Sequence, residues 1–151
     1  IIMHPPCIAL AVSGNASYAK GKPKYKEREE SIIETLTSFS VAKSSAWSVC
    51  MENPVGVLPI KPNQYIQPWQ FGHPESKKTG LWLYNLKPLK ETNNVKDVYD
   101  SLPKKEQQKI YYMPHTKDRS EKRSITYQGI ADAMAEQWGC KEENIKQFIG
   151  G

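Results

Sequence analysis

Two short apolar runs separated by one long helical segment constrain the fold of this chain more than any other feature. Residues 1–4 and residues 47–51 each have the length of a buried strand. Proline follows both runs within three residues and cannot donate a hydrogen bond to a strand ladder. Between them, residues 27–44 have the spacing of an amphipathic helix, with Leu36 and Phe39 on one face. A strand, a helix and a strand in this order predict a right-handed crossover between two parallel strands.

The remainder of the chain is expected to be rich in loops. Residues 13–26 combine glycine, proline and lysines and predict a mobile, basic loop, and residues 54–79 are expected to be irregular. Residues 81–84 are a third strand candidate, and a short helix is expected around residues 103–110. Residues 126–138 repeat apolar side chains every four positions and predict a last helix. The fold class expected is therefore α/β, with a mainly parallel sheet and helices on both faces.

The composition fits a single domain over residues 1–151. Hydrophobic residues make up 38% of the chain and charged residues 25%, so a core is expected and wholesale disorder is not. No run of about 18 apolar residues occurs, and we expect no membrane-spanning helix. A net charge of +5 favours a polyanionic partner. The first apolar run begins at residue 1, so the sequence reads as one that starts partway through a domain.

The cysteines indicate reduced thiols and no metal site. Cys7, Cys50 and Cys140 form no CxxC pair, and the three histidines add no spacing typical of zinc ligands. An odd number of cysteines without a signal peptide predicts a cytoplasmic location. Cys50 lies within the second apolar run and is expected to be a core residue. Cys140 follows the last helix and is expected to have no role.

The residues with the strongest chemical character lie where the two predicted parallel strands end. The first strand leads into His4-Pro5-Pro6-Cys7, and the second leads into Glu52-Asn53-Pro54. Ligands bind beyond the carboxyl ends of such strands, so these two motifs are expected side by side although they are 45 residues apart. A cysteine with a partnered acid is the minimum equipment for adding a thiolate to carbon 6 of a cytosine ring.

Further segments extend these two motifs into an ordered set. Ser13-Gly14-Asn15 follows Cys7, residues 71–79 read Phe-Gly-His-Pro-Glu-Ser-Lys-Lys-Thr, and the third apolar run comes next. In this order the segments resemble the Pro-Cys loop, the Glu-Asn-Val motif and the Tyr-Gly-x-Pro-Gln-x-Arg-x-Arg segment of cytosine-C5 DNA methyltransferases. The whole chain, including the helix around residues 130–135, is closer still to small bacteriophage proteins described as cytosine methyltransferase-like.

The resemblance implies a fold, a reaction and a set of site residues. The fold would be part of a class I (Rossmann-like) methyltransferase sheet that lacks its N-terminal S-adenosylmethionine-binding part. The reaction would be methylation of cytosine in DNA at carbon 5, with S-adenosylmethionine as the methyl donor. Cys7 would attack carbon 6, and Glu52 would bind nitrogen 3 and the amino group. The implied substrate-binding residues are Pro6, Ser13, Asn53, Lys77 and Lys78, and Asn53 would also join the two loops. The basic residues 13–26 would correspond to the loop that closes over a flipped-out base.

The chain departs from the family pattern at several positions. Ile8 replaces the glutamine that follows the cysteine, Pro54 replaces valine, and Glu75 and Thr79 replace members of the Gln-x-Arg-x-Arg set. No glycine-rich turn or acidic ribose-binding residue precedes Cys7, so the donor site is expected to be incomplete in this chain. About 40 residues separate the third strand from the last helix, which is small for a target-recognition domain.

Three other functions fit part of the pattern. His-Pro-Pro-Cys also resembles the Asp/Asn-Pro-Pro-Tyr/Phe motif of amino-methyltransferases, a scheme in which Glu52 and Asn53 have no role. A non-catalytic nucleic-acid-binding remnant would stack bases on aromatic side chains beside lysines, although such side chains more often fill the core of a small domain. The aromatic residues concerned are Trp69, Trp82, Tyr111 and Tyr112. A free-nucleotide enzyme would need only a short recognition segment. Whatever the function, a truncated sheet edge is expected to promote pairing of two chains into a dimer.

Overall fold

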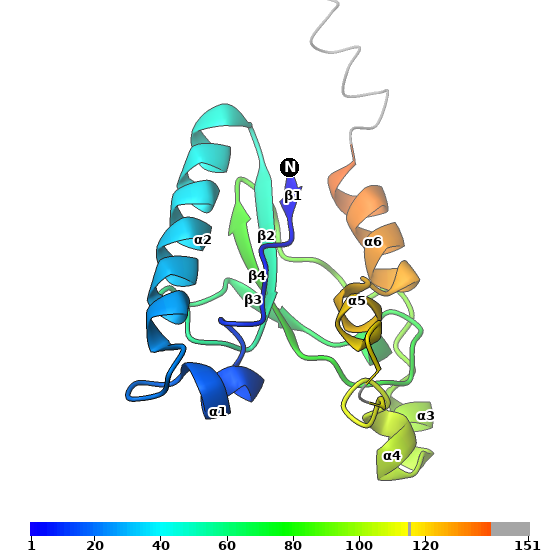
Figure 1. The fold of residues 1–151 in the computed structure, drawn as a ribbon. Coiled ribbons are helices and arrows are strands. Elements are labelled where there is room, and N and C mark those ends of the chain that lie inside the picture. The colour runs from blue at the N-terminus through cyan, green and yellow to red at the C-terminus, as the bar shows by residue number, and fades with distance from the viewer. Residues whose placement is uncertain (115, 140–151) are drawn as a thin grey trace, which may run out of the picture. The chain divides into compact units, whose positions relative to one another are not determined.

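The computed structural model describes residues 1–114 and 116–139, which belong to two compact units (Figure 1). Unit 1 consists of Ile1–Gln67 and Lys77–Pro88, and unit 2 consists of Pro68–Ser76 and Leu89–Gly151. The chain therefore leaves unit 1 after Gln67, returns to it at Lys77 for the last strand, and leaves it again after Pro88. The single domain expected from the length of the chain stays a prediction.

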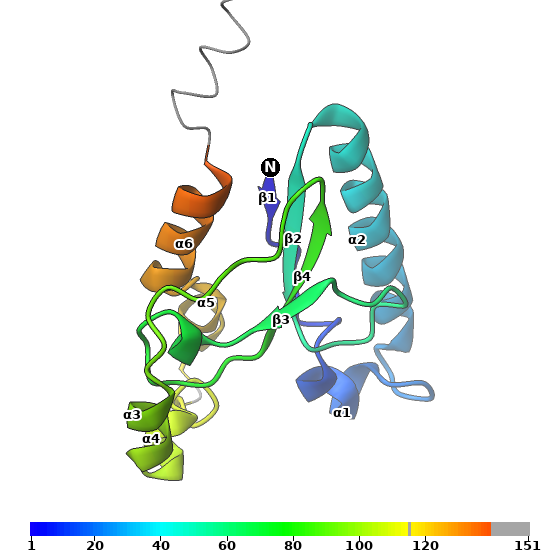
Figure 2. The same ribbon diagram turned by 180° about the vertical axis from the view of Figure 1, so that it is seen from behind.

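Unit 1 is built on a four-stranded mixed sheet. Its strands are β1 (Ile2–Met3), β2 (Val49–Pro54), β3 (Gln64–Ile66) and β4 (Thr79–Tyr84), in the spatial order β1-β2-β4-β3. The pair β1-β2 is parallel, whereas β4 is antiparallel to both of its neighbours. It follows that β1, β2 and β3 run in one direction and β4 runs in the other, as the view from behind also shows (Figure 2).

The structure confirms the α/β class and the parallel pair, but the expectation of a mainly parallel sheet is wrong. A parallel pair requires a long crossover. Among the described strands, β1 and β2 are the neighbours that such a crossover joins, through the helix α2 (Tyr25–Ser45). After β3 the chain passes through residues 68–76 of unit 2 and returns as β4, which lies between β2 and β3 and runs in the opposite direction. The region expected to be irregular also contains β3, which is too short to show an alternating pattern.

The helix α2 packs on one face of this sheet, and its predicted position is confirmed. Phe39 and Ala42 of the helix form a core cluster with Met51 of β2 and Trp82 of β4. Met51 and Trp82 are opposite each other in the antiparallel register, so both side chains lie on the face that α2 covers. Figure 1 shows the helix running along the strands. The helices expected on both faces of the sheet are therefore shown for one face only.

The basic stretch expected to be a loop contains regular structure. A 3-10 turn, η1 (Val12–Gly14), leads into the short helix α1 (Asn15–Tyr18), which contacts α2. Only the residues between α1 and the start of α2 at Tyr25 form turns without a helix. The base-covering loop expected over residues 13–26 is thus partly helical.

Unit 2 consists of short helices around a small core, and the predicted last helix is confirmed. Its elements are η2 (Pro68–Gln70), α3 (Lys96–Ser101), α4 (Lys104–Gln107), α5 (Arg119–Ser124) and α6 (Gln128–Trp138). Ile130, Ala133 and Met134 of α6 are buried. No described helix of either unit has the length and apolar character needed to cross a lipid bilayer.

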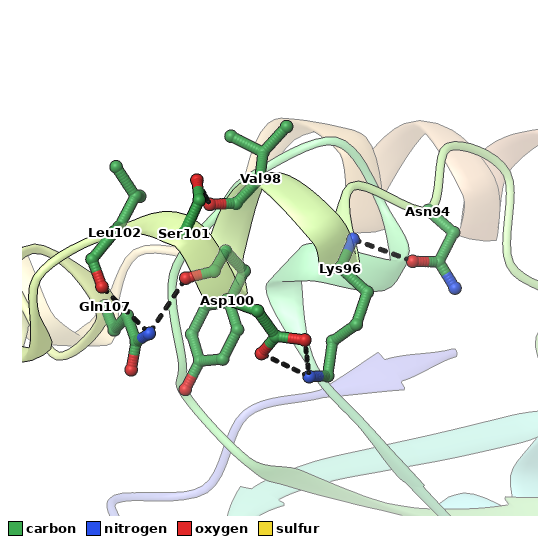
Figure 3. Close-up of polar contacts among 8 residues, drawn as sticks. Asn94, Lys96, Val98, Asp100, Ser101, Leu102 and Gln107 are labelled. Carbon is green, nitrogen blue, oxygen red and sulfur yellow. Dashed lines mark hydrogen bonds and ion pairs between the residues drawn. The ribbon is translucent and has the colours of Figure 1, made fainter.

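Polar contacts connect α3 and α4 (Figure 3). The side chain of Gln107 donates hydrogen bonds to the carbonyl groups of Tyr99 (2.9 Å) and Leu102 (3.0 Å), which end α3. Lys96 and Asp100 form an ion pair one turn apart on the same helix. Because helices of this length are not stable alone, these contacts hold the segment in place.

Candidate functional site

The ends of β1 and β2 bring the two sequence motifs into direct contact. The last residues paired between the two parallel strands are Met3 and Met51, which directly precede the two motifs. His4 Nδ1 lies 3.4 Å from Glu52 Oε2, and Asn53 Nδ2 donates a hydrogen bond of 3.4 Å to the Pro5 carbonyl. The predicted contact between the motifs is therefore present. The link that Asn53 was expected to make between the two loops is also present, whereas its contact with a substrate stays a prediction.

Glu52 presents an unusual carboxylate. Its side chain is 10% exposed, and Oε2 makes no hydrogen bond to any described residue. The neighbouring His4 side chain is 50% exposed, and its 3.4 Å approach is an ion-pair distance without hydrogen-bond geometry. A buried carboxylate oxygen without a donor is unfavourable, and such atoms are rare in folded proteins. A ligand with a hydrogen-bond donor would satisfy this oxygen.

Asn53 faces away from Glu52. Successive side chains of a strand point to opposite faces, so Glu52 and Asn53 lie on different sides of the sheet. Asn53 is 1% exposed, and its Oδ1 also lacks a hydrogen-bond partner among the described residues. The structure thus assigns Asn53 to the junction with Pro5, while Glu52 is the residue that presents an acid.

Cys7 lies in the segment between β1 and α1, here called the Cys7 loop, which contacts the segment following β2. Val57 N donates to the carbonyl of Leu10 (3.0 Å), and Val12 N donates to the carbonyl of Val55 (3.3 Å). Together with the contact between Asn53 and the Pro5 carbonyl, these bonds fix the chain on both sides of Cys7. The cysteine is partly buried and forms no disulfide. The loop therefore holds a free thiol beside the segment that begins with Glu52.

The backbone of this loop approaches its neighbour too closely for side chains. A Cβ atom on Gly56 would lie 2.4 Å from the Leu10 carbonyl oxygen. Within the loop, a Cβ atom on Gly14 would lie 2.7 Å from the Ile8 carbonyl oxygen. Both distances are shorter than Cβ contacts found in proteins. Glycine at these two positions allows the loop to close around Cys7.

Arg28 of α2 holds the same loop from the other side, and the sequence analysis missed it. Its guanidinium donates to the carbonyls of Ala9 (2.6 Å) and Ala11 (3.3 Å) and to Asn15 Oδ1 (2.8 Å). The side chain is 5% exposed, and no carboxylate pairs with it in the part of the chain that the structure describes. A periodicity signal existed, because Arg28 stands eleven positions before the buried Phe39, on the same helix face.

The second described cysteine is structural. Cys50 is fully buried on β2. Burial raises the pKa of the Cys50 thiol to about 12, and the nearby Glu52 carboxylate acts in the same direction. The thiol stays protonated at neutral pH and is a poor nucleophile. The prediction of a core residue is confirmed for Cys50, whereas Cys140 lies outside the described residues.

The two predicted substrate-binding lysines directly precede β4. The first residue of β4 pairs with Pro54, so Lys77 and Lys78 are at the sheet edge where β2 ends. The backbone N–H of Lys77 donates to Gln67 Oε1 at 3.1 Å. The Lys78 ammonium lies 4.4 Å above the centroid of the Tyr65 ring. Both lysines therefore belong to the same end of unit 1 as the Cys7 loop.

Ser13 and Pro6 also lie in this loop region. Pro6 is exposed and directly precedes Cys7. Ser13 is exposed in η1, next to the residue whose N–H binds the Val55 carbonyl. All seven predicted site residues are therefore in unit 1, near the carboxyl ends of β1 and β2. Their roles in binding a substrate stay predictions.

The segment that was compared with Tyr-Gly-x-Pro-Gln-x-Arg-x-Arg is divided between the two units after Ser76. Within unit 2, Glu75 accepts a hydrogen bond of 2.6 Å from Tyr127 and lies 3.6 Å from Lys109 Nζ. Burial and this carboxylate raise the pKa of Tyr127. His73 Nε2 accepts a hydrogen bond from the Gly129 N–H at 3.1 Å. Glu75 and His73 thus hold the start of α6 in unit 2.

The described residues contain no glycine-rich turn of the kind expected to bind S-adenosylmethionine. A nucleotide-like cofactor is bound at a glycine-rich turn directly after a strand, with the chain close to the ligand. The described glycines with left-handed backbone are Gly21, between α1 and α2, and Gly72, after η2, and neither follows a strand. The described residues also contain no group of three or more His, Cys, Asp or Glu side chains suited to a metal ion.

Comparison of the chain with protein-family models, with curated proteins and with solved structures gives no match. Function must therefore be inferred from the chemistry of the site. The features that any function must account for are the free Cys7 thiol and the buried, unsatisfied Glu52 carboxylate.

Proposed function

We propose that unit 1 carries the base-activating part of a cytosine-C5 DNA methyltransferase, with Cys7 as the nucleophile and Glu52 as the acid. The observation that carries this proposal is the nearly buried Glu52 carboxylate, which has an unsatisfied oxygen and lies in β2, beside the segment that contains Cys7. Cytosine offers such an oxygen a matching edge, since its amino group donates a hydrogen bond and its nitrogen 3 accepts a proton. Cys7 would then face the ring carbon that a thiolate attacks.

The proposed step is a reversible addition to the ring. The Cys7 thiolate forms a bond to carbon 6 while the electron pair of the carbon 5–carbon 6 double bond moves into the ring. Nitrogen 3 takes a proton from the Glu52 carboxylic acid, so the adduct is a neutral enamine whose carbon 5 is nucleophilic. His4, half exposed and 3.4 Å away, would give Glu52 a route for proton exchange with water. Reversal of these steps releases the cysteine and restores the base.

The proposal for this chain ends at the activated base. Complete methyl transfer would also require a site for S-adenosylmethionine, and neither described glycine with left-handed backbone follows a strand. The amino-methyltransferase alternative leaves both Glu52 and the free Cys7 thiol without a task, and we rank it second. A thiol nucleophile works only in its reduced state, which suits the cytoplasmic location expected for the chain.

The addition step is tested without a methyl donor. A cytosine that forms the adduct can exchange its carbon 5 hydrogen with solvent, so incubation in heavy water labels the base. We expect mass spectrometry to detect deuterium in an oligodeoxycytidine treated with the full chain. Cys7→Ser should abolish the exchange, and Glu52→Gln should slow it by about 10²–10⁴-fold because the acid is lost.

Cys50→Ala is the matched control, since this cysteine is buried and protonated. Exchange should persist in that variant as long as circular dichroism shows a folded protein. Absence of exchange with the unmodified chain, or exchange that survives Cys7→Ser, would refute the proposed function.

A further inference from the structure

The excess positive charge of the protein belongs entirely to unit 1. Its residues include ten lysines and arginines and five glutamates, whereas unit 2 contains eleven basic and eleven acidic residues. Unit 1 therefore carries the whole net charge of +5, and unit 2 is neutral. Residues 53–67 and 77–88, which follow Glu52 in this unit, contain four lysines and no acidic residue. The positive electrostatic potential of unit 1 favours binding of a polyanion to this unit.

An open hollow of about 90 Å³ lies within this basic region. Trp82 is 6% exposed, and its indole N–H donates to the Ile60 carbonyl at 3.0 Å, so it forms a fixed wall of the hollow. Tyr65 forms part of the rim and is 46% exposed. The remaining lining residues are Val55, Gly56, Leu58, Ile60, Lys61 and Pro62. Cavities that enclose a whole small molecule are larger, at about 300 Å³ or more, so a planar ring would rest in this hollow instead of being enclosed.

Two lysines frame the exposed ring. The Lys78 ammonium lies 4.4 Å above the Tyr65 ring centroid, and Lys61 lines the hollow. Neither ammonium forms an ion pair with a carboxylate of any described residue. An exposed aromatic ring flanked by unpaired cations is the combination with which proteins hold a single nucleic-acid strand: the ring stacks a base and the cations contact phosphates.

The hollow lies beside the loop that contains Cys7. Val55 and Gly56 line it, and the same two residues contact the loop that contains Cys7. Gly80 pairs with both Asn53 and Tyr65, so Tyr65 lies on the face of the sheet that Asn53 occupies, whereas Glu52 points to the other face. A strand whose cytosine lies at Cys7 therefore has a basic, aromatic surface beside it.

We infer that this hollow binds an unstacked base of a single-stranded nucleic acid, with Tyr65 stacking on the base and Lys61 and Lys78 contacting the neighbouring phosphates. That this base is a neighbour of the target cytosine rests on the proposed function. In a duplex the neighbouring base stays stacked in the helix and cannot reach Tyr65. The preferred partner of unit 1 is therefore a single strand. A duplex cannot stack a base on Tyr65, and a free nucleotide has no neighbouring phosphates for Lys61 and Lys78.

The test is a fluorescence-anisotropy titration of the full chain with a labelled oligodeoxycytidine, alone or annealed to its complement. We expect the single strand to bind at least about tenfold more tightly than the duplex at low salt. Tyr65→Ala should weaken single-strand binding by about tenfold, because a stacked base is lost. Tyr111→Ala, which removes a tyrosine of unit 2 that is 67% exposed, should change nothing. Lys61→Gln and Lys78→Gln should each make the slope of log binding constant against log salt concentration shallower by about 0.7. Lys105→Gln of unit 2 should leave this slope unchanged.

Equal affinity for the duplex, or equal effects of Tyr65→Ala and Tyr111→Ala, would overturn the inference, as would no binding of the single strand at low salt. Failure of the proposed function is distinguishable, because stacking at Tyr65 does not require the Cys7 thiol. If only the function is wrong, the unmodified chain binds the single strand but exchanges no carbon 5 hydrogen. If only the inference is wrong, exchange occurs and is unaffected by Tyr65→Ala.

Discussion

The Arg28 guanidinium donates a hydrogen bond of 2.6 Å to the Ala9 carbonyl, so the helix that covers the sheet also holds the loop that follows Cys7. The contact is nearly buried, and two further bonds from the same side chain fix the turn. A cation without a carboxylate beside it also leaves positive charge close to the loop. This arrangement would favour a nearby phosphate.

Replacement of Arg28 should therefore affect stability and the proposed chemistry together. Arg28→Ala leaves the Ala9 and Ala11 carbonyls without their donors and should lower the free energy of unfolding by about 2–3 kcal/mol. Arg28→Lys keeps the charge but not the forked geometry of the guanidinium. Its rate of carbon 5 exchange should therefore lie between those of Arg28→Ala and the unmodified chain. Urea unfolding and the heavy-water assay measure the two effects. Lys26→Ala on the same helix, where the side chain is 86% exposed, serves as the control.

The close approach of Gly56 to Leu10 makes a second prediction. Gly56→Ala places a methyl group 2.4 Å from a carbonyl oxygen and forces the Cys7 loop away from β2. We expect a loss of about 1–3 kcal/mol in unfolding free energy and little carbon 5 exchange. Gly21→Ala is a useful comparison, because its strain comes from a φ of +82° with open space around it. That variant should lose about 1 kcal/mol and keep its exchange activity; equal exchange in the two variants would count against the role given to Gly56.

Cys50 should make the stability of the protein depend on pH in alkaline solution. Its pKa is raised to about 12 by burial, whereas a cysteine of the unfolded chain titrates near 8.5. Between these values the unfolded chain has lost a proton that the folded chain keeps, so the free energy of unfolding falls as pH rises. The stabilisation is fully present below about pH 8.5 and is lost at about 1.4 kcal/mol per pH unit above it.

Urea unfolding of the unmodified chain and of Cys50→Ala at about pH 8 and about pH 10.5 measures this contribution. Tyr127, whose pKa is also raised, is present in both proteins, so its effect cancels. The slope with pH should be shallower in the variant. Parallel slopes would mean that Cys50 is not protected from ionisation.

Asn53 should stabilise the junction between the two loops and should not act as a proton donor. Asn53→Asp replaces a buried donor to the Pro5 carbonyl with an acceptor and should destabilise the fold by about 2–4 kcal/mol. Asn53→Ala removes the same bond without adding a charge and should lose about 1–2 kcal/mol. Thermal and urea unfolding compare the two variants. If Asn53→Ala is more stable than Asn53→Asp, the result supports a structural role for the buried Asn53 amide.

The sequence predicted the local elements well because their signals are local. The spacing of apolar residues located α2 and α6, and the strand–helix–strand order predicted both the parallel pair and the meeting of His4-Pro5 with Glu52-Asn53. The burial of Cys50 followed from its place within an apolar run. The three-residue β3, by contrast, is too short for any periodic pattern, and the short helices of unit 2 are held by side-chain contacts such as those of Gln107.

What the sequence by itself determined is thus the crossover and the placement of Cys7 and Glu52 at its strand ends, because connection length and strand direction leave one arrangement. Only the tertiary structure decided that β4 lies antiparallel between β2 and β3, since strand order depends on pairings far apart in the chain. It also decided that Arg28 points inward to the Cys7 loop and that a Glu52 oxygen has no donor. Hydrogen bonding of buried groups is a property of the packed molecule, and no spacing in the sequence records it.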